Sequence, residues 1–332
     1  MVIVENYLIA VIMCFVTMLC WGSWANTQKL ASKEWKFQLF YWDYAIGVFL
    51  LALVFALTMG SLGEAGRSFF ADLGQMSTKA FLFTFIAGVV FNIANILLVA
   101  AIDIAGMSVA FPIGIGIALV EGVIINYIAK PKGNPVLLFI GVAAVAIAII
   151  FDAKAYSKLP SEGFKTTKKG IIISVICGLL MGLWYYLIQA GMATNFANPQ
   201  PGLLEPYAAV VIFSLGLLVS TFIWNSNFIS ELLTGERVNF RKYFTEGDFK
   251  LHMFGILGGI IWGVGTSFNI IASGEAGPSI SYGLGQSAPM IAALWGVFIW
   301  KEFENAEEGT NKFLVMMFLF FLIGLGLIIL AR

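Results

Sequence analysis

The chain has 332 residues, of which 60% are hydrophobic and 11% are charged, and 19 lysines and arginines balance 19 aspartates and glutamates. Soluble domains carry about 25% charged residues, so this composition excludes an ordinary soluble protein and indicates an integral membrane protein. The zero net charge gives no basic excess of the kind that nucleic-acid binding requires. The three cysteines lie inside apolar runs, at spacings that favour neither a disulfide framework nor a metal site.

Ten apolar runs are long enough to cross a bilayer as helices, since about 20 residues span the hydrocarbon core. The N-terminal segment "MVIVEN" contains Glu5 and no lysine or arginine. This argues against a cleaved signal peptide, so we expect the first run to be a span. The predicted spans are 7–28, 38–60, 79–102, 106–129, 136–152, 170–193, 203–224, 250–273, 277–300 and 313–331.

The lysines and arginines divide unevenly between the two sets of connections. Fourteen of them fall in the odd-numbered connections, and five fall in the even-numbered connections or at the C-terminus. Cytoplasmic connections of membrane proteins carry the excess of positive charge. We therefore expect the odd-numbered connections in the cytoplasm and both termini outside, in a bacterial inner (plasma) membrane.

The two halves of the chain contain matching stretches, and the two strongest matches share one sequence offset without a gap. Self-similarity of this kind indicates an internal duplication. The strong matches are "AGVVFNIAN" (87–95) with "GGIIWGVGT" (258–266) and "IAGMSVAFPIG" (104–114) with "EAGPSISYGLG" (275–285), and the weak ones are "WGSW" (21–24) with "MGLW" (181–184) and "DYA" (43–45) with "PYA" (206–208).

The duplication predicts an all-α membrane protein built from two five-helix repeats. The first repeat is residues 1–152, the second is 170–332, and 153–169 forms a cytoplasmic linker. Because each repeat has an odd number of spans, the second must enter the membrane from the opposite face, which makes the repeats inverted. Many secondary transporters are inverted repeats that bind substrate near the midplane, where the repeats meet.

The fourth and ninth spans contain residues that interrupt helices at corresponding places. Pro112 and Gly114 lie in the fourth span, and Gly285 and Pro289 lie in the ninth. Proline removes a backbone donor, and glycine loosens a helix. Both residues are also common in membrane helices without a binding role, but matched interruptions in two halves favour a transport site. We predict that both spans are broken beside the substrate.

Aromatic and amide side chains within the spans are the predicted substrate-binding groups. Aromatic faces stack on the apolar faces of sugars and on planar amides, and amides both donate to and accept from hydroxyl or ureido groups. A tryptophan near a span end can equally anchor the helix at the interface, and a buried amide can equally join two helices. The predicted substrate-binding residues are Trp24, Asn95, Phe111, Trp184, Tyr282 and Gln286.

Glu121 is the predicted proton-coupling residue of the fourth span. It precedes Lys130 by nine residues, which places it about 13 Å from the helix end, close to the middle of the membrane. An intramembrane carboxylate is costly and marks function by default. The alternative is a structural hydrogen bond to a neighbouring helix.

Asp43, near the start of the second span, is the other predicted proton-coupling residue. A structural pairing with Lys36 or Lys29 is an equal alternative. Glu205 lies at a span end and is expected to be solvated, and His252, the single histidine, gives no chemical signal of its own. No metal or organic cofactor is predicted, and the coupling ion is H⁺ or Na⁺.

Three stretches resemble the drug/metabolite transporter superfamily, in the branch that holds glucose/ribose porters, the rhamnose–proton symporter and plant ureide permeases. "WGSWANTQKL" resembles a segment in span one of ureide permeases, "WDYAIG" resembles the start of their span two, and "GMSVAFPIGIGIAL" resembles a glycine-rich segment of the rhamnose symporter. The resemblance implies ten helices in two inverted five-helix repeats and uptake of a small polar solute with protons. The central loop "SEGFKTTKKG" lacks a phosphate-binding motif, and Ala25 stands where ureide permeases have proline, which argues against ureide specificity.

We therefore expect a secondary transporter with alternating access and a sugar as its first choice of substrate. A ureide, nucleobase or nucleoside is the second choice, and export of a metabolite is the third; the sequence leaves the oligomeric state open. The rival interpretation, an intramembrane aspartyl protease, needs two carboxylates that share a proton. Gln286 stands where the second aspartate would be required, and no phosphate-binding motif supports an ATP-driven pump.

Overall fold

The computed structural model describes residues 1–31, 35–160, 167–227 and 240–332. Within these ranges the chain is helical, and an isolated bridge between Met192 and Leu204 is the only β-type pairing. Ten of its helical segments are long and apolar enough to cross a membrane, so the ten predicted spans are confirmed. Part of the predicted linker 153–169, together with Lys33 and Arg237 of the charge count, lies outside the described residues.

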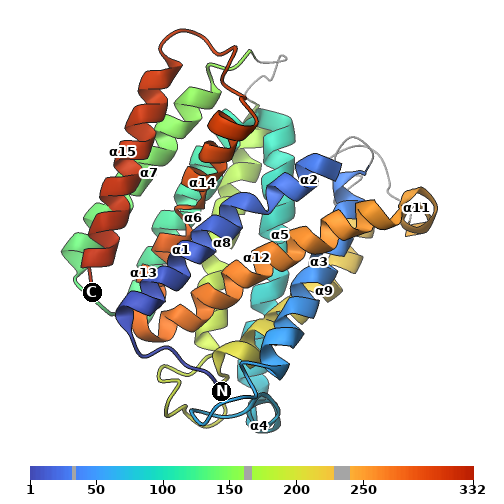
Figure 1. Cartoon of the computed structure of the whole chain (residues 1–332), viewed down its shortest axis with the longest axis vertical. Coiled ribbons are helices and arrows are strands. Elements are labelled where there is room, and N and C mark those ends of the chain that lie inside the picture. Colours follow the sequence, from blue (N-terminus) through green and yellow to red (C-terminus); the bar gives the residue numbers. More distant parts are fainter. Residues whose placement is uncertain (32–34, 161–166, 228–239) are drawn as a thin grey trace. The chain divides into compact units, whose positions relative to one another are not determined.

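The helices are labelled as in Figure 1. They are α1 (Tyr7–Ser23), α2 (Ala25–Ala31), α3 (Phe37–Leu57), α4 (Phe69–Gln75), α5 (Thr78–Ala105), α6 (Met107–Ala129), α7 (Pro135–Tyr156), α8 (Lys168–Ala190), α9 (Pro206–Asn227), α11 (Phe240–Glu246), α12 (Phe249–Ala276), α13 (Pro278–Gly285), α14 (Ala288–Leu294), the π-helix η1 (Trp295–Ile299) and α15 (Thr310–Leu330).

The fifth span is longer than predicted. We expected it to end at residue 152, but α7 runs on to Tyr156. Asp152, where the predicted span ends, is only 2% exposed and lies within the helix. The start of α7 follows ordinary rules, since Asn134 caps the backbone N–H groups of the first turn and Pro135 occupies the first helical position.

The predicted interruptions differ between the two spans. The ninth span is interrupted where expected, since α13 ends at Gly285 and Pro289 lies in the first turn of α14. The fourth span is not broken, because α6 continues through Pro112 and Gly114. Pro112 lies within the first two turns of α6, so its missing N–H affects only the beginning of the helix.

The chain forms two compact units that do not coincide with its two sequence halves. The first unit contains residues 1–92 and 187–275, and the second contains 93–186 and 276–332. Each unit therefore takes segments from both halves. The division into repeats at 1–152 and 170–332 stays a proposal about how the chain is duplicated.

In the first unit, α3 crosses α12 with the two backbones in contact. A methyl group added at Gly47 would overlap the carbonyl oxygen of Ile256, and one added at Gly259 would overlap that of Tyr44. Small residues allow membrane helices to approach this closely and gain packing energy that lipid would otherwise supply.

The same unit contains a second crossing of this kind, between α5 and α9. A methyl group at Gly88 would overlap the carbonyl oxygen of Phe213, and one at Gly216 would overlap that of Phe85. Asn92 adds a hydrogen bond from its amide to the Ser220 hydroxyl, at 2.8 Å.

The two crossings correspond in position along the chain. Gly88 and Gly259 are separated by the same offset as the two strong sequence matches, and Gly47 and Gly216 are separated by nearly that offset. These contacts support the proposed duplication. The weak "DYA"–"PYA" match has a shorter offset and lies outside this register. Three-residue patterns are too short to fix a register.

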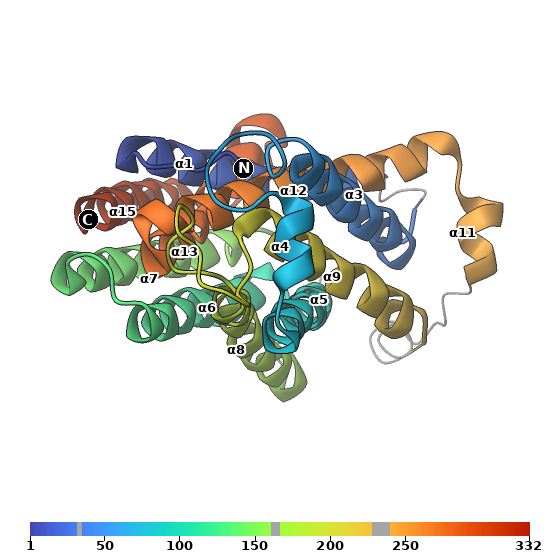
Figure 2. The ribbon, with the colours of Figure 1, turned by 90° about the horizontal axis from the view of Figure 1, so that it is seen from below.

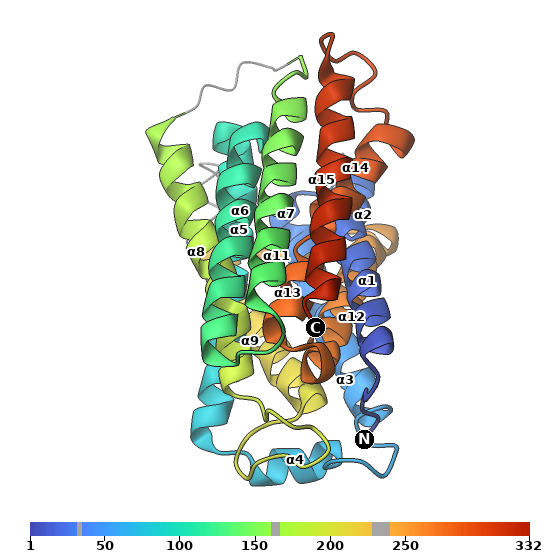
Figure 3. The ribbon, with the colours of Figure 1, turned by 90° about the vertical axis from the view of Figure 1, so that its left-hand side faces the viewer.

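Two short helices outside the spans also correspond. α4 and α11 have seven residues each, and the same offset separates their first residues, Phe69 and Phe240. α4 lies against the start of α9 (Figures 2 and 3), whereas α11 lies against the start of α3 through Tyr243. The first unit therefore has a short capping helix at each end of its helix crossings.

In the second unit, α7 and α15 lie side by side (Figures 1 and 3). A methyl group at Gly141 would come within 3.0 Å of the Gly324 carbonyl oxygen, and one at Gly324 within 2.8 Å of the Gly141 oxygen. This reciprocal contact makes the pair a rigid edge of the unit.

Candidate functional site

The predicted site residues fall in both units, and each unit is considered by itself. Five of the six substrate-binding residues belong to the second unit, together with Glu121. Trp24 and Asp43 belong to the first unit.

The aromatic group of the second unit is centred on Tyr282 of α13. Its ring centroid lies 4.9 Å from that of Tyr185 and 6.5 Å from that of Trp184, both on α8. The Tyr282 hydroxyl donates to the carbonyl oxygens of Met181 at 2.9 Å and Ala118 at 3.2 Å. Tyr282 is fully buried, and its hydroxyl is already used by the backbone, so it supports the site rather than offering a polar group to a solute.

Glu121 of α6 lies beside this aromatic group. A methyl group added at Gly182 of α8 would come within 2.9 Å of Glu121 Oε2. That oxygen is buried and has no hydrogen-bond partner among the described residues. A buried acceptor without a hydrogen-bond partner is costly. The position of Glu121 therefore favours a carboxyl group that binds a proton or accepts a hydrogen bond from a solute.

The two predicted amides lie near the surface of the buried core. Asn95 is 6% exposed, and Gln286, which caps α13, is 7% exposed. Gln286 follows Tyr282 by one turn, and its N–H donates to the Tyr282 carbonyl oxygen at 2.9 Å. Phe111 is half-buried on α6, and among the described residues its ring stacks on neither Trp184 nor Tyr282. The structure thus joins Gln286, Tyr282, Trp184 and Glu121, but not Phe111.

In the first unit, Trp24 belongs to a larger aromatic group that the sequence analysis did not identify. Its ring centroid lies 4.8 Å from that of Tyr44, which lies 6.0 Å from Trp262 on α12. Trp262 also stacks with Trp21 at 6.2 Å and contacts Phe91 at 4.5 Å. Trp262 is therefore the common member, although its stretch "GGIIWGVGT" entered the sequence analysis only as a repeat match.

The Trp-Gly-Ser-Trp stretch has a structural role in this unit. The Trp21 indole donates to the Thr266 hydroxyl at 3.0 Å, and the Thr17 hydroxyl donates to the Gly265 carbonyl oxygen at 2.8 Å. These bonds fasten α1 to α12. Trp24 is partly exposed beside them.

Asp43 is the centre of a polar cluster in the first unit. It is 1% exposed, accepts a hydrogen bond from the Tyr243 hydroxyl, and lies 2.9 and 3.1 Å from Nδ1 of His252. Burial, and to a smaller extent the neighbouring Asp43 carboxyl, raises the pKa of Tyr243 above its ordinary value. The phenol therefore keeps its proton and donates the hydrogen bond. Neither partner could be predicted from the sequence, because neither lies near Asp43 in the chain.

A second polar cluster of the first unit, the Arg67 cluster, consists of Arg67, Asp72, Gln75 and Glu205. Arg67 Nε lies 2.8 Å from Asp72 Oδ1, and the Arg67 backbone N–H donates to Glu205 Oε2 at 2.6 Å. The Glu205 N–H donates to Asp72 Oδ2 at 2.8 Å. Gln75 donates to Asp72 Oδ1 at 3.1 Å and accepts from the Gly202 N–H at 2.6 Å. The cluster ties α4 to the segment that leads into α9.

The expectation that Glu205 is solvated was wrong. Glu205 and Asp72 are each 1% exposed, and they share one guanidinium. Burial raises the pKa of Glu205 to about 7, and burial also raises the pKa of Asp72. Glu205 Oε1 has no hydrogen-bond partner among the described residues. A position at a span end predicts exposure to solvent. The sequence does not reveal that the 61–77 segment folds over Glu205.

Glu205→Gln is expected to remove a pH dependence of stability. Between its ordinary pKa of 4.5 and its folded value of about 7, the folded state binds more protons than the unfolded state. Stability therefore falls as pH rises through this window, by up to ~3 kcal/mol above pH 7. Thermal unfolding in detergent should show the variant melting higher than wild type at pH 8 and alike at pH 5. Glu64→Gln, at an exposed position of the same segment, is the control; equal pH profiles for Glu205→Gln and wild type would contradict the assignment.

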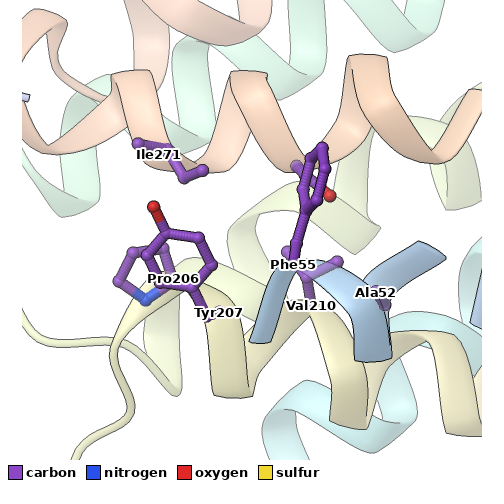
Figure 4. Close-up of a pocket in the computed structure, with 7 residues that line it drawn as sticks. Ala52, Phe55, Pro206, Tyr207, Val210 and Ile271 are labelled. Carbon is purple, nitrogen blue, oxygen red and sulfur yellow. The ribbon is translucent and has the colours of Figure 1, made fainter. Parts of the chain in front are cut away.

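The first unit also contains a crevice and a groove. Figure 4 shows a crevice between α3, α9 and α12, where Tyr207 points toward Ile271 and Phe55 points toward another turn of α12. It contains about 170 Å³ of empty space but no room for a water-sized molecule. A larger groove of about 550 Å³ lies beside the N-terminal segment and is lined mainly by apolar side chains. Neither space includes a predicted site residue.

The chain was then compared with known proteins. The profile of the family described as "sugar transport protein" matches residues 12–331. Ureide permease 1 of Arabidopsis thaliana is 23% identical to this chain over 96% of both proteins, and ureide permease 5 of that plant is 23% identical over 98% of this chain and 95% of its own length. The glucose uptake protein GlcU of Bacillus subtilis (strain 168) is 25% identical over 76% of this chain and 79% of its own length.

One solved crystal structure superposes on the chain with a TM-score of 0.62 and 13% sequence identity. The superposition covers 96% of this chain and 95% of that one. At this identity the likeness shows a shared fold and nothing about the solute.

Proposed function

Because the chain belongs to the sugar transport protein family, it is a membrane transporter and not an enzyme, and we propose that it takes up a sugar by symport with protons. The observation that carries this proposal is the extent of the family match. It runs from residue 12 to residue 331 and so includes all ten spans. No part of the described chain is left to form a separate catalytic domain.

The side chains of the second unit support a polar solute of modest size. Gln286 and Asn95 provide amides that can both donate to and accept from hydroxyl groups. Trp184 lies within one aromatic group with Tyr185 and Tyr282, and such faces stack on sugar rings.

Two buried acidic groups support coupling to protons. Glu121 has an unpartnered carboxylate oxygen in the middle of a span, and Asp43 is almost fully buried at the start of another. Ionisable residues inside transporters commonly serve proton relays. In the proposed orientation both termini and the Arg67 cluster face the outside of a plasma membrane, and α11 faces the cytoplasm.

A ureide is the second candidate for the solute. The ureide permeases align along almost the whole chain, whereas the glucose uptake protein of Bacillus subtilis aligns along about three quarters of it. Identities near 25% in both cases leave the solute to be decided by measurement. Export of a metabolite needs the same site with the opposite gradient.

Counterflow into proteoliposomes identifies the solute. We expect one or more labelled hexoses or pentoses to exchange, and allantoin and nucleosides not to exchange. Gln286→Leu should lower sugar exchange about tenfold, since losing one hydrogen bond to a sugar hydroxyl costs about 1.4 kcal/mol. Asn198→Leu, at an exposed position, is the matched control. Exchange of allantoin alone would replace the sugar by a ureide, and exchange of neither would refute both candidates.

A further inference from the structure

Both helix crossings of the first unit have glycines at corresponding positions, but a polar pair is present at one of them and absent from the other. At the α3–α12 crossing, Asp43 contacts His252. In the register set by the glycine contacts, the corresponding residues of the α5–α9 crossing are Ile212 and Phe81. The scaffold therefore forms without a polar pair at this position. Since a buried carboxylate is costly, the pair at the α3–α12 crossing needs a reason other than packing.

Asp43 and His252 differ in their exposure to solvent, and this difference separates their roles. Asp43 is 1% exposed, and His252 is 23% exposed, so the histidine connects the buried carboxylate with solvent. Nδ1 of His252 lies 2.9 Å from Asp43 Oδ2. This fixes the neutral tautomer with a proton on Nδ1 and leaves Nε2 free of a proton.

Nε2 of His252 points toward the turn between α11 and α12. A methyl group added at Gly247 would overlap this nitrogen. Glycine at this position therefore lets the turn lie directly against Nε2. The Trp35 ring packs edge-on against the imidazole at 5.2 Å and holds its plane.

The helices around the pair carry further charged residues. On α11, the Tyr243 hydroxyl donates to Asp43, and Lys242 pairs with Glu246 at 3.4 Å on the exposed face. Asp248, ahead of α12, accepts the Leu251 N–H at 2.8 Å. Lys36 precedes α3. Of the side chains in contact with Asp43, His252 has a second ring nitrogen that can accept a proton.

We propose that His252 binds the coupling proton of the transport cycle and that Asp43 positions it; this rests on the proton symport proposed above. In the empty state Asp43 is ionised and His252 is neutral, with its proton on Nδ1. Loading adds one proton from water to Nε2, and the pair becomes a neutral carboxylate–imidazolium pair. Unloading returns the Nε2 proton to water on the α11 side, and the Nδ1 proton stays against Asp43 throughout.

His252→Asn separates this role from a structural one. The asparagine amide nitrogen can occupy the position of Nδ1 and donate to Asp43, but it binds no proton near neutral pH. We expect gradient-driven accumulation in proteoliposomes to fall at least tenfold, whereas counterflow, which needs no net proton movement, stays within about twofold of wild type. Glu205→Gln, in the Arg67 cluster, is the matched control and should retain gradient-driven accumulation.

A direct readout of the residue needs no transport. His252 is the only histidine of the chain, so ¹⁵N-histidine labelling of the full chain, purified without a histidine tag, gives one pair of imidazole signals. We expect the neutral imidazole to carry its proton on Nδ1, and Asp43→Asn to abolish this tautomer preference. Gly247→Ala should displace the Nε2 signal, and Gly74→Ala, which has open space around it, should not.

The outcomes distinguish the inference from the function on which it rests. If wild type accumulates solute with a proton gradient and His252→Asn does so equally, His252 does not carry the proton, although proton symport stands. If wild type exchanges solute but ignores the gradient, symport itself fails and the inference fails with it. An imidazole protonated on Nε2 in the neutral form would also overturn the proposed positioning by Asp43.

Discussion

Arg67→Met is expected to destabilise the protein by about 3–5 kcal/mol, which is the usual cost of leaving a buried charge without its partner. The reason is specific to the Arg67 cluster. One guanidinium, 21% exposed, serves two carboxylates that are 1–2% exposed, and it also donates to the Leu203 carbonyl oxygen at 2.6 Å. Its removal leaves the buried Asp72 and Glu205 carboxylates without a positive partner.

The size of this effect should depend on pH. Below pH 7, Glu205 gains a proton, since its pKa is about 7, so the loss on Arg67→Met should be smaller at pH 5 than at pH 8. Thermal unfolding in detergent at both pH values measures it. Adding Glu205→Gln to the variant should restore part of the loss, and Lys79→Met, at an exposed position, should cost little. Equal losses at both pH values would mean that the carboxylates are not the cause.

Gly88→Ala and Gly259→Ala are expected to destabilise the first unit by about 1–3 kcal/mol each, since overpacking a close contact has a cost of this size. At both positions the new methyl group meets backbone, the carbonyl oxygens of Phe213 and Tyr44. A side chain could rotate away, but a helix backbone can only move as a whole. Because Gly88 and Gly259 occupy corresponding positions, the two substitutions should cause similar losses of stability.

The matched controls should change stability in the opposite direction. Gly116 and Gly326 lie in helices with open space where a methyl group would be placed. Alanine favours a helix over glycine by about 1 kcal/mol, so Gly116→Ala and Gly326→Ala should be neutral or stabilising. Unfolding of the four variants under one condition tests this. A loss of stability at Gly326 as large as that at Gly259 would show that the close backbone contact at the crossing is not the cause of the loss.

The span architecture could be predicted from the sequence because hydropathy is local. Each span is a run of apolar residues, and the ten runs correspond to ten helical segments of the structure. The repeat signal was also visible, since the glycines that allow close crossings, such as Gly88 and Gly259, occupy equivalent places in both halves. The unbroken α6 could not be predicted, because the effect of Pro112 depends on how near it lies to the helix start.

The partners of the polar residues could not be predicted, because they are far apart in the chain. Asp43 and His252 are separated by 209 residues, and Arg67 and Glu205 by 138. A charged residue at a predicted span end looks the same whether water or a folded segment covers it. Glu205 therefore seemed solvated and His252 inert, and only the packing of α4 and α11 gives them their surroundings.

Proton symport is the central claim, and solute-induced proton entry tests it most directly. Proteoliposomes that hold a pH-sensitive dye, with no initial pH gradient and with the membrane potential clamped at zero, are given the sugar identified by counterflow. Wild type is predicted to acidify the lumen as the sugar enters, with His252→Asn taking up sugar without acidification. Sugar entry into wild-type vesicles with no change in internal pH would contradict the claim and make this protein a facilitator.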